Sequence, residues 1–212
     1  MDVIIRRLGL IDYSMTWEAM RWFTDRRTGL TEDELWCLEH PPVFTLGLGG
    51  KPEHVLDPGT IPVVRVDRGG QITYHGPGQL LLYVLVDLRR LGWGIRKLVH
   101  LLEQSVIDAL HTFGVIAVRY SGAPGVYIGE SKIAALGLRV KRGCTYHGLA
   151  LNVDMDLSPF GRINPCGYPG LSVTQTRDQG IAEDVETLAH ALLSNLIEYL
   201  GYERHVVKTT LE

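Results

Sequence analysis

The chain has 212 residues, enough to bury one hydrophobic core, and we expect a single domain over residues 1–212. Hydrophobic residues make up 45% and charged residues 21%, and no apolar run reaches the ~20 residues of a membrane helix. The formal net charge of -3 argues against nonspecific nucleic-acid binding, which needs a basic domain. The first residues resemble a strand and lack the features of a signal peptide, so the expected location is the cytoplasm.

The first third of the chain alternates short strands with one helix. Ser14 is the expected cap of this helix and Gly29 its end. Apolar residues at helical spacing predict that Trp17 and Trp22 both lie in the core. The strands predicted in this part of the chain span residues 3–10, 33–39, 43–46 and 63–67.

Strands and helices also alternate in the rest of the chain. The strands predicted here span residues 80–88, 115–119, 132–140 and 146–153. Amphipathic patterns predict helices over residues 96–113 and 182–200, which end at Gly114 and Gly201. The combination predicts an α+β fold with a central mixed β-sheet flanked by helices.

Residues 68–79, Arg-Gly-Gly-Gln-Ile-Thr-Tyr-His-Gly-Pro-Gly-Gln, form the most unusual stretch of the chain. Their glycines let a ligand approach the backbone closely and leave amide N–H groups free to donate. The stretch connects two predicted strands, a position where proteins often carry binding sites. A glycine-rich hairpin connection without a site is an equally good interpretation of this pattern alone.

The three cysteines, Cys37, Cys144 and Cys166, show no CxxC spacing, so we expect neither a disulfide framework nor a metal site. Cys37 falls within a predicted strand and is expected to be a buried hydrophobic residue. Cys166 lies between a proline and a glycine in a loop, where an ordinary core residue is not expected. We therefore predict that Cys166 is the reactive thiol.

A reactive cysteine needs a neighbour that favours its thiolate form. Lys132 begins an apolar strand, so its ammonium is expected to be partly desolvated and easily perturbed. A surface lysine at a strand end is the alternative interpretation. His75 and His147 are two further candidate bases for a cysteine, and the sequence alone does not choose among the three.

Two of the predicted strands carry small residues at several positions. These residues are Ala134, Ala135 and Gly137 on one strand and Gly148 and Ala150 on the other. Small side chains leave volume unfilled beside a sheet. We therefore expect a narrow apolar slot at this place.

Five blocks of sequence carry a family resemblance. They are residues 68–79, Gly-Val-Tyr at 125–127, Lys-Ile-Ala-Ala-Leu-Gly at 132–137, His-Gly-Leu-Ala-Leu-Asn-Val at 147–153 and Asn-Pro-Cys-Gly at 164–167. In this order they closely resemble the octanoyltransferases of lipoate biosynthesis, also called lipoyl(octanoyl) transferases. The resemblance implies the fold of the biotin and lipoate protein ligase catalytic domains.

The resemblance further implies an acyltransferase that takes an octanoyl or lipoyl group from acyl carrier protein. The implied acceptors are lysines on the lipoyl domains of 2-oxoacid dehydrogenase E2 subunits and on glycine-cleavage H protein. Cys166 would form an acyl thioester and Lys132 would activate this thiol and act as acid and base, with no ATP, other cofactor or metal. The implied acyl site consists of Arg68, Gly69, Gly70, Gln71, Ile72, Thr73, Tyr74, His75, Ala135, Leu136, Gly137, Gly148, Leu149 and Ala150.

Two groups of basic residues would suit the acidic carrier protein and lipoyl domain. The first group is Arg65, Arg68, Arg89, Arg90, Arg96 and Lys97, and the second is Arg139, Lys141 and Arg142. Two other functions also fit the sequence. One is an ATP-dependent lipoate or biotin ligase, which would have no use for Cys166, and the other is a noncatalytic acyl- or lipoyl-domain-binding module.

Overall fold

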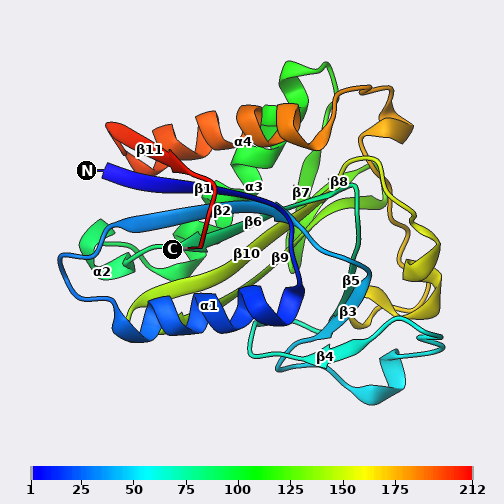
Figure 1. Ribbon diagram of the computed structural model, residues 1–212. Helices are drawn as coiled ribbons and strands as arrows, with labels where there is room; N and C mark the ends of the chain where they lie inside the picture. Colours follow the sequence, from blue (N-terminus) through cyan, green and yellow to red (C-terminus); the bar gives the residue numbers. More distant parts are fainter. Residues whose placement is uncertain (1, 212) are drawn as a thin grey trace.

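A large mixed β-sheet forms the centre of the computed structural model, which describes residues 2–211 (Figure 1). Its strands are β1 (Asp2–Leu10), β2 (Asp33–Glu39), β6 (Gln79–Leu85), β7 (Val118–Tyr120), β8 (Ala123–Ile128), β9 (Ser131–Lys141), β10 (Cys144–Asn152) and β11 (Arg204–Lys208). They lie in the order β11-β1-β2-β6-β10-β9-β8-β7. The β11-β1 and β1-β2 pairs are parallel and the others antiparallel, so the predicted α+β fold with a central mixed sheet is confirmed.

A second, three-stranded sheet lies at one end of the large sheet, at the lower right of Figure 1. Its strands are β3 (Val43–Leu46), β4 (Val63–Arg65) and β5 (Ile72–His75), in the order β4-β3-β5. Strand β5 falls inside the glycine-rich stretch that the sequence predicts as a loop. It forms because it pairs antiparallel with β3 and packs Tyr74 against Phe44 and Phe160.

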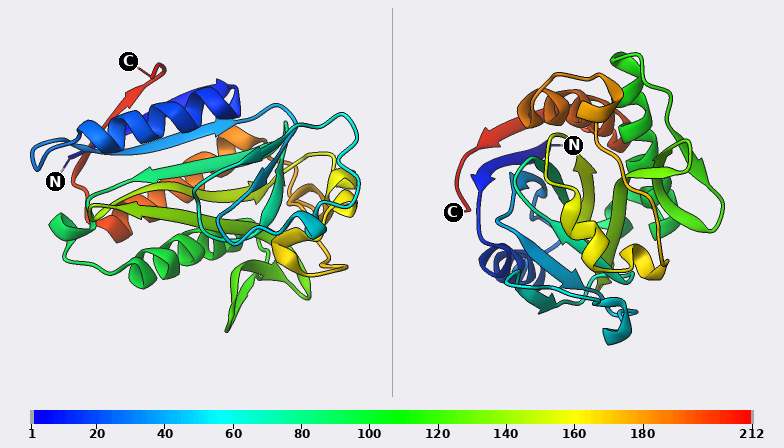
Figure 2. Two further views of the ribbon diagram at one scale, coloured as in Figure 1. Left: turned by 90° about the horizontal axis from the view of Figure 1, so that it is seen from below. Right: turned by 90° about the vertical axis from the view of Figure 1, so that its right-hand side faces the viewer.

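Helices cover both faces of the large sheet (Figures 1 and 2). They are α1 (Tyr13–Arg26), α2 (Leu88–Leu91), α3 (Ile95–Thr112) and α4 (Val185–Leu200). Helices α3 and α4 lie on one face, and α1 lies on the other. No helix among residues 2–211 is both long and apolar enough to cross a lipid bilayer.

Strand β6 is buried on both faces because it lies in the middle of this layered structure. Its alternate residues Leu80, Leu82 and Val84 pack in the core beneath α3 and α4, while Leu81 and Tyr83 pack on the α1 side. A fully buried leucine contributes about 1.5–3 kcal/mol. This double core holds rigid the part of the sheet on which the candidate site is built.

The predicted first helix differs from the observed one in its boundaries and in one core residue. The α1 helix is capped by Asp12, whose side chain accepts the N–H of Met15, and it ends at Arg26 well before the predicted Gly29. Trp22 is 60% exposed and lies under the guanidinium of Arg26, so its predicted place in the core is wrong. The helix turns a different stripe inward, with Met20 fully buried.

Several short elements were missed by the sequence predictions. Residues 86–88 do not continue β6, because the Asp87 side chain caps α2 instead. The C-terminal strand β11 pairs with the edge strand β1, although its exposed residues give little periodicity. Four short 3-10 helices also occur within residues 2–211. They are η1 (Pro52–His54), η2 (Ser158–Arg162), η3 (Pro165–Gly167) and η4 (Arg177–Gln179).

Candidate active site

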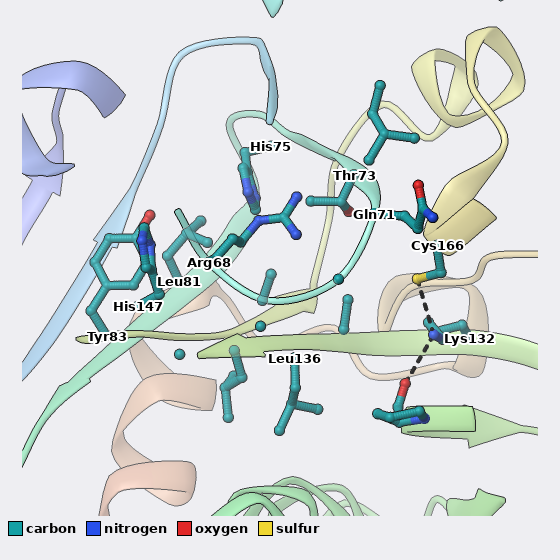
Figure 3. Close-up of a pocket in the computed structure, with 18 of the residues that line it drawn as sticks. Arg68, Gln71, Thr73, His75, Leu81, Tyr83, Lys132, Leu136, His147 and Cys166 are labelled. Atoms are coloured by element: carbon teal, nitrogen blue, oxygen red, sulfur yellow. Dashed lines mark hydrogen bonds between the residues drawn. The ribbon is translucent and has the colours of Figure 1, made fainter. Parts of the chain in front are cut away.

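A cavity of about 210 Å³ lies on the α1 side of the large sheet. Strands β6, β9 and β10 contribute one wall, and residues between 68 and 75 contribute the opposite one. In Figure 3 the labelled side chains extend from Cys166 and Lys132 on one side to Tyr83 and His147 on the other. Aliphatic side chains line it between these ends, so the cavity suits an apolar ligand whose reactive group lies at Cys166.

The thiol of Cys166 is presented by a strained turn. Cys166 has a φ of 56°, a left-handed conformation that is uncommon for residues other than glycine. Backbone hydrogen bonds hold this turn, from Gly167 N–H to Asn164 O at 2.9 Å and from Tyr168 N–H to Pro165 O at 3.0 Å. As a result Cys166 stays partly exposed at the edge of the cavity instead of being buried in the core.

The ammonium of Lys132 contacts this thiol directly. Its Nζ lies 3.2 Å from Cys166 Sγ and donates a hydrogen bond of 3.0 Å to Pro124 O. The lysine is 6% exposed, and no carboxylate among residues 2–211 forms an ion pair with it. Its backbone N–H donates to Ser172 O and its carbonyl accepts from Thr174 N–H, which ties the segment after Cys166 to β9.

Two opposing effects set the protonation of Lys132. Burial lowers the pKa of its ammonium, but the charge of the Cys166 thiolate and the hydroxyl of Tyr127 raise it more. The pKa of Lys132 therefore lies above its ordinary value. An ammonium that keeps its proton favours the thiolate form of a neighbouring cysteine. The pair can thus supply a nucleophile together with a proton donor.

His75 also lines the cavity, but its ring is fully engaged elsewhere. Nδ1 donates to Gln79 Oε1 at 2.7 Å, and Nε2 accepts from the Thr45 hydroxyl at 3.3 Å. The orientation of Gln79 is fixed because its Nε2 donates to Asn152 Oδ1 at 2.9 Å. Burial, followed by the nearby His40, lowers the pKa of His75 to about 3, so that the ring is neutral at pH 7.

Arg68 extends this network along the cavity. Its Nη2 donates to the Thr45 carbonyl at 2.5 Å and to the Thr45 hydroxyl at 2.8 Å, and Nη1 donates to Gly69 O at 2.9 Å. It is 8% exposed, and within residues 2–211 no ion pair neutralises it. A buried guanidinium of this kind can orient a carbonyl or an anion that enters the cavity.

His147 lies at the end of the cavity away from the thiol. Its Nε2 donates to Asp67 Oδ1 at 3.0 Å, and the Asp67 carboxylate also accepts from Trp17 Nε1 and the Tyr146 hydroxyl. The other ring nitrogen of His147 and the hydroxyl of Tyr13 are buried and have no hydrogen-bond partner within residues 2–211. Both residues line the cavity, so these two atoms can hydrogen-bond a polar group inside it.

The small residues of β9 and β10 lie directly opposite one another. Gly137 pairs with Gly148 and Ala135 pairs with Ala150, as expected for the predicted slot. Gly148 has a second reason to be glycine, because a Cβ there would lie 1.9 Å from the carbonyl oxygen of Leu82 on β6. The small residues therefore allow both an open cavity and a close approach of two strands.

Comparison with known proteins supplies the family. Residues 12–197 match the lipoyl protein ligase A/B catalytic domain. The octanoyltransferase of Thiobacillus denitrificans is 62% identical over 195 residues, which cover 92% of this chain and 89% of that protein. The chain belongs to the octanoyltransferase family.

Two solved structures share the octanoyltransferase fold at low sequence identity. Lipoate-protein ligase A bound with ATP gives a TM-score of 0.81 at 18% identity, covering 100% of this chain and 91% of that chain. Biotin protein ligase from Aquifex aeolicus gives a TM-score of 0.55 at 12% identity, covering 95% of this chain and 69% of that chain. The predicted fold of the biotin and lipoate ligase catalytic domains is therefore confirmed.

Most residues predicted for the acyl site of this octanoyltransferase family member line the cavity. They are Arg68, Gly70, Gln71, Ile72, Thr73, His75, Ala135, Leu136, Gly137, Gly148, Leu149 and Ala150. Two predicted residues are not part of this lining. Tyr74 packs against Phe44 and Phe160, and the N–H of Gly69 donates to Leu138 O, so Gly69 fastens the loop to β9.

Several lining residues lie outside the recognised blocks and are not predicted from the sequence. They are Tyr13 on α1, Leu81 and Tyr83 on β6, Ala123 and Pro124 on β8, and Tyr168 after η3. The strand alternation of β6 puts Leu81 and Tyr83 on one face, and this was the available signal. The sequence offered no comparable signal for Tyr13 or for the carbonyl of Pro124.

Several residues of the two predicted basic groups are buried or form ion pairs in this octanoyltransferase family member. Arg68 is buried in the cavity, and Arg90 forms an ion pair with the fully buried Asp33. In the second group, Lys141 and Arg142 both form ion pairs with Asp25. Much of the predicted positive charge is therefore balanced within the chain.

Proposed function

We propose that this chain, as one catalytic domain over residues 1–212, transfers an octanoyl or lipoyl group through a thioester on Cys166. The donor is acyl carrier protein, and the acceptors are lysines on lipoyl domains of 2-oxoacid dehydrogenase E2 subunits and on glycine-cleavage H protein. The observation that carries the proposal is the contact between Lys132 Nζ and Cys166 Sγ at the edge of an apolar cavity. The 62% identity to an octanoyltransferase supports it.

The first half-reaction forms the acyl-enzyme. The Cys166 thiolate attacks the carbonyl carbon of the octanoyl thioester, and the carbon–sulfur bond to the carrier breaks. The departing carrier thiolate takes a proton from the Lys132 ammonium, which leaves a neutral amine beside the new thioester. One thioester replaces another of similar energy, so this step needs no ATP.

The second half-reaction passes the group to the acceptor. The ε-amine of the lipoyl-domain lysine attacks the thioester carbonyl, and the bond to Cys166 Sγ breaks. The neutral Lys132 amine accepts the proton that the attacking amine releases, which restores the ammonium–thiolate pair. Formation of an amide from a thioester is downhill, so this half also proceeds without ATP.

The remaining cavity residues hold the acyl chain in this scheme. The side chains of Ala135, Leu136 and Ala150 pack along the acyl chain. Arg68 lines the opposite wall of the cavity. His75 fixes that wall through Thr45 and is not the base, because both ring nitrogens are engaged elsewhere. An apolar cavity excludes water from the thioester, which limits wasteful hydrolysis.

The decisive experiment incubates the purified protein with octanoyl-carrier protein in the absence of ATP. Intact-mass analysis should show one octanoyl adduct, and the adduct should be absent from Cys166→Ser. Addition of a lipoyl domain should then remove the adduct and place the octanoyl group on the lipoyl domain. Cys144→Ser serves as the matched control and should acquire the adduct normally.

The same experiment separates the competing functions. Modification of the lipoyl domain that requires ATP and a free fatty acid, and survives Cys166→Ser, would instead indicate a ligase. Binding of the acyl chain with no adduct and no transfer, unaffected by Lys132→Ala, would indicate a noncatalytic module. Either result would overturn the proposed function.

A further inference from the structure

Glu103 on α3 is a buried carboxylate next to the Cys166–Lys132 pair. Its side chain is 10% exposed, although glutamates are rarely buried unless they are paired. Oε1 accepts the backbone N–H of Gly125 at 2.9 Å, and Oε2 lies 3.6 Å from Arg119 Nε. The shorter of the two contacts of the carboxylate is therefore the one to a backbone N–H group of β8.

That N–H belongs to the same peptide group whose carbonyl receives Lys132. The peptide bond joins Pro124 and Gly125, and Lys132 Nζ donates to Pro124 O at 3.0 Å. One peptide group thus lies between the carboxylate of Glu103 and the ammonium of Lys132. Hydrogen bonds in series polarise one another, so an anion at the N–H makes the carbonyl a stronger acceptor.

The contact requires glycine at position 125. Gly125 has a φ of 129°, and a Cβ there would lie 2.7 Å from Ala134 O and 3.3 Å from Lys132 Nζ. Only a residue without a side chain lets this peptide group approach the lysine so closely. Figure 3 shows this arrangement, in which Lys132 is hydrogen-bonded to Cys166 on one side and to a carbonyl oxygen on the other.

We propose that Glu103 is a positioning residue for Lys132 and acts on the ammonium through the Pro124–Gly125 peptide group. The carboxylate aligns and polarises this group, which holds Nζ against Cys166 Sγ and favours its charged form. Glu103 does not touch the acyl group. Its purpose in transfer rests on the proposed function, whereas its effect on the Lys132 proton does not require a substrate.

Other groups also face the pair and must be constant in any test. Tyr127 on β8 lies with its ring centre 5.1 Å from Lys132 Nζ. Arg68 faces Cys166 from the opposite wall, and His54 on η1 lies beside Gly167. Arg119 on β7 is the cation nearest to Glu103, so its charge opposes that of the carboxylate.

The test titrates the Lys132 amine directly. In a Cys166→Ser background, which removes the thiolate, Lys132 is labelled with acetic anhydride over a range of pH and quantified by peptide mass analysis. Glu103→Gln keeps an oxygen that can accept from Gly125 but removes the charge. We expect the midpoint of its labelling profile to fall by about 0.5–1 pH unit, or about threefold to tenfold faster labelling below the midpoint.

The midpoint separates positioning from a purely structural role. The rate at high pH reports access to the amine, so a change confined to that plateau would indicate altered packing. Asp108→Asn, which removes a different carboxylate from α3, should leave the midpoint unchanged. An unchanged midpoint in Glu103→Gln would overturn the proposal and leave Glu103 as a link between α3 and β8.

A second variant keeps the proposal testable if Glu103→Gln is unstable. The double variant Glu103→Gln/Arg119→Gln is compared with Arg119→Gln alone, so that Arg119 is absent from both proteins, and it should show the lower midpoint of the two. Equal midpoints in these two folded variants would equally overturn the proposal. Because labelling uses no acyl substrate, failure of octanoyl transfer in the unmodified chain would sink the proposed function and leave this result standing.

Discussion

Lys132 Nζ and Cys166 Sγ lie 3.2 Å apart although 34 positions separate them along the chain. Main-chain pairing between the segments that carry the two residues brings their side chains together. Val173 forms a parallel bridge with Lys132, which fixes the segment following Cys166 beside the start of β9. The turn η3 is thereby anchored close to the lysine, and its left-handed Cys166 presents the thiol to Nζ.

The first prediction concerns the relative reactivity of the three cysteines. Iodoacetamide should alkylate Cys166 at pH 7 much faster than Cys37 or Cys144. Burial raises the pKa of Cys37 to about 12 and also raises the pKa of Cys144, so both remain unreactive thiols. Peptide-resolved mass analysis of the native protein gives all three rates in one experiment.

The matched variant for this prediction is Lys132→Met, which keeps the length of the side chain and removes its charge. Alkylation of Cys166 should slow by about tenfold or more, since the thiolate loses its nearby cation. Lys51→Met removes an exposed lysine and should change nothing. Equal rates at all three cysteines, or an unaffected rate in Lys132→Met, would contradict the idea of an activated thiolate.

The sequence predicted the contents of the site better than its construction. Cys166, Lys132 and the small residues of two strands stood out because glycine, proline and alternating small side chains are local signals. The partner of Cys166 could not be chosen, because a contact across 34 positions depends on how η3 is tied to β9. Glu103 gave no signal either, since in α3 it reads as one polar residue of an amphipathic helix.

The same limit explains the errors in the fold. The sequence predicts Trp22 in the core because an aromatic residue at helical spacing normally packs inward. The buried face of α1 differs from the predicted one and includes Met20. Asp12 rather than Ser14 caps the first turn of the helix. The sequence predicts a loop at β5 because its glycine-rich flanks are typical of one, whereas its pairing with β3 is a long-range contact that local sequence does not indicate.

The second prediction tests the cavity as an acyl slot. Ala150→Leu should project a larger side chain into the space between β10 and the opposite wall. Octanoyl transfer should fall by about tenfold or more, because about three added carbons displace part of the chain. Transfer of a butyryl group, measured in parallel with the same carrier, should be much less affected.

Alkylation by iodoacetamide provides the internal control for this variant. The reagent is small, so Cys166 should react at the normal rate in Ala150→Leu. Ala182→Leu, at an exposed position, should leave both octanoyl transfer and butyryl transfer unchanged. Equal losses of octanoyl and butyryl transfer would mean that the side chain at position 150 does not limit the space available to the acyl chain.

The third prediction compares the two opposite glycines of the slot. Gly148→Ala should destabilise the protein by about 3 kcal/mol, because its Cβ would collide with the rigid backbone of β6 at Leu82. Gly137→Ala should cost only about 1 kcal/mol, since its nearest contacts are Arg68 Cδ and Gly69 O at 3.1 Å. Urea unfolding of both variants measures the difference, and equal costs would contradict it.

The fourth prediction concerns acid sensitivity. Burial lowers the pKa of His40 to about 4, although the Ile11 carbonyl opposes this effect, and the pKa of His75 is about 3. Below about pH 6.5 these two histidines are therefore protonated in the unfolded chain but remain neutral in the folded protein. Each histidine should remove about 2 kcal/mol of stability between pH 6.5 and pH 5, with no contribution above pH 6.5.

The geometry of His40 shows why its neutral form is required. Nδ1 donates to Ile11 O at 2.6 Å and Nε2 accepts from the Tyr83 hydroxyl at 2.7 Å, so a second ring proton would face the hydroxyl proton. His40→Gln should reduce the stability lost between pH 7 and pH 5, measured as urea midpoints at both pH values. His111→Gln, at an exposed position, should retain the full loss. A full loss in His40→Gln as well would show that His40 is not responsible for the acid sensitivity.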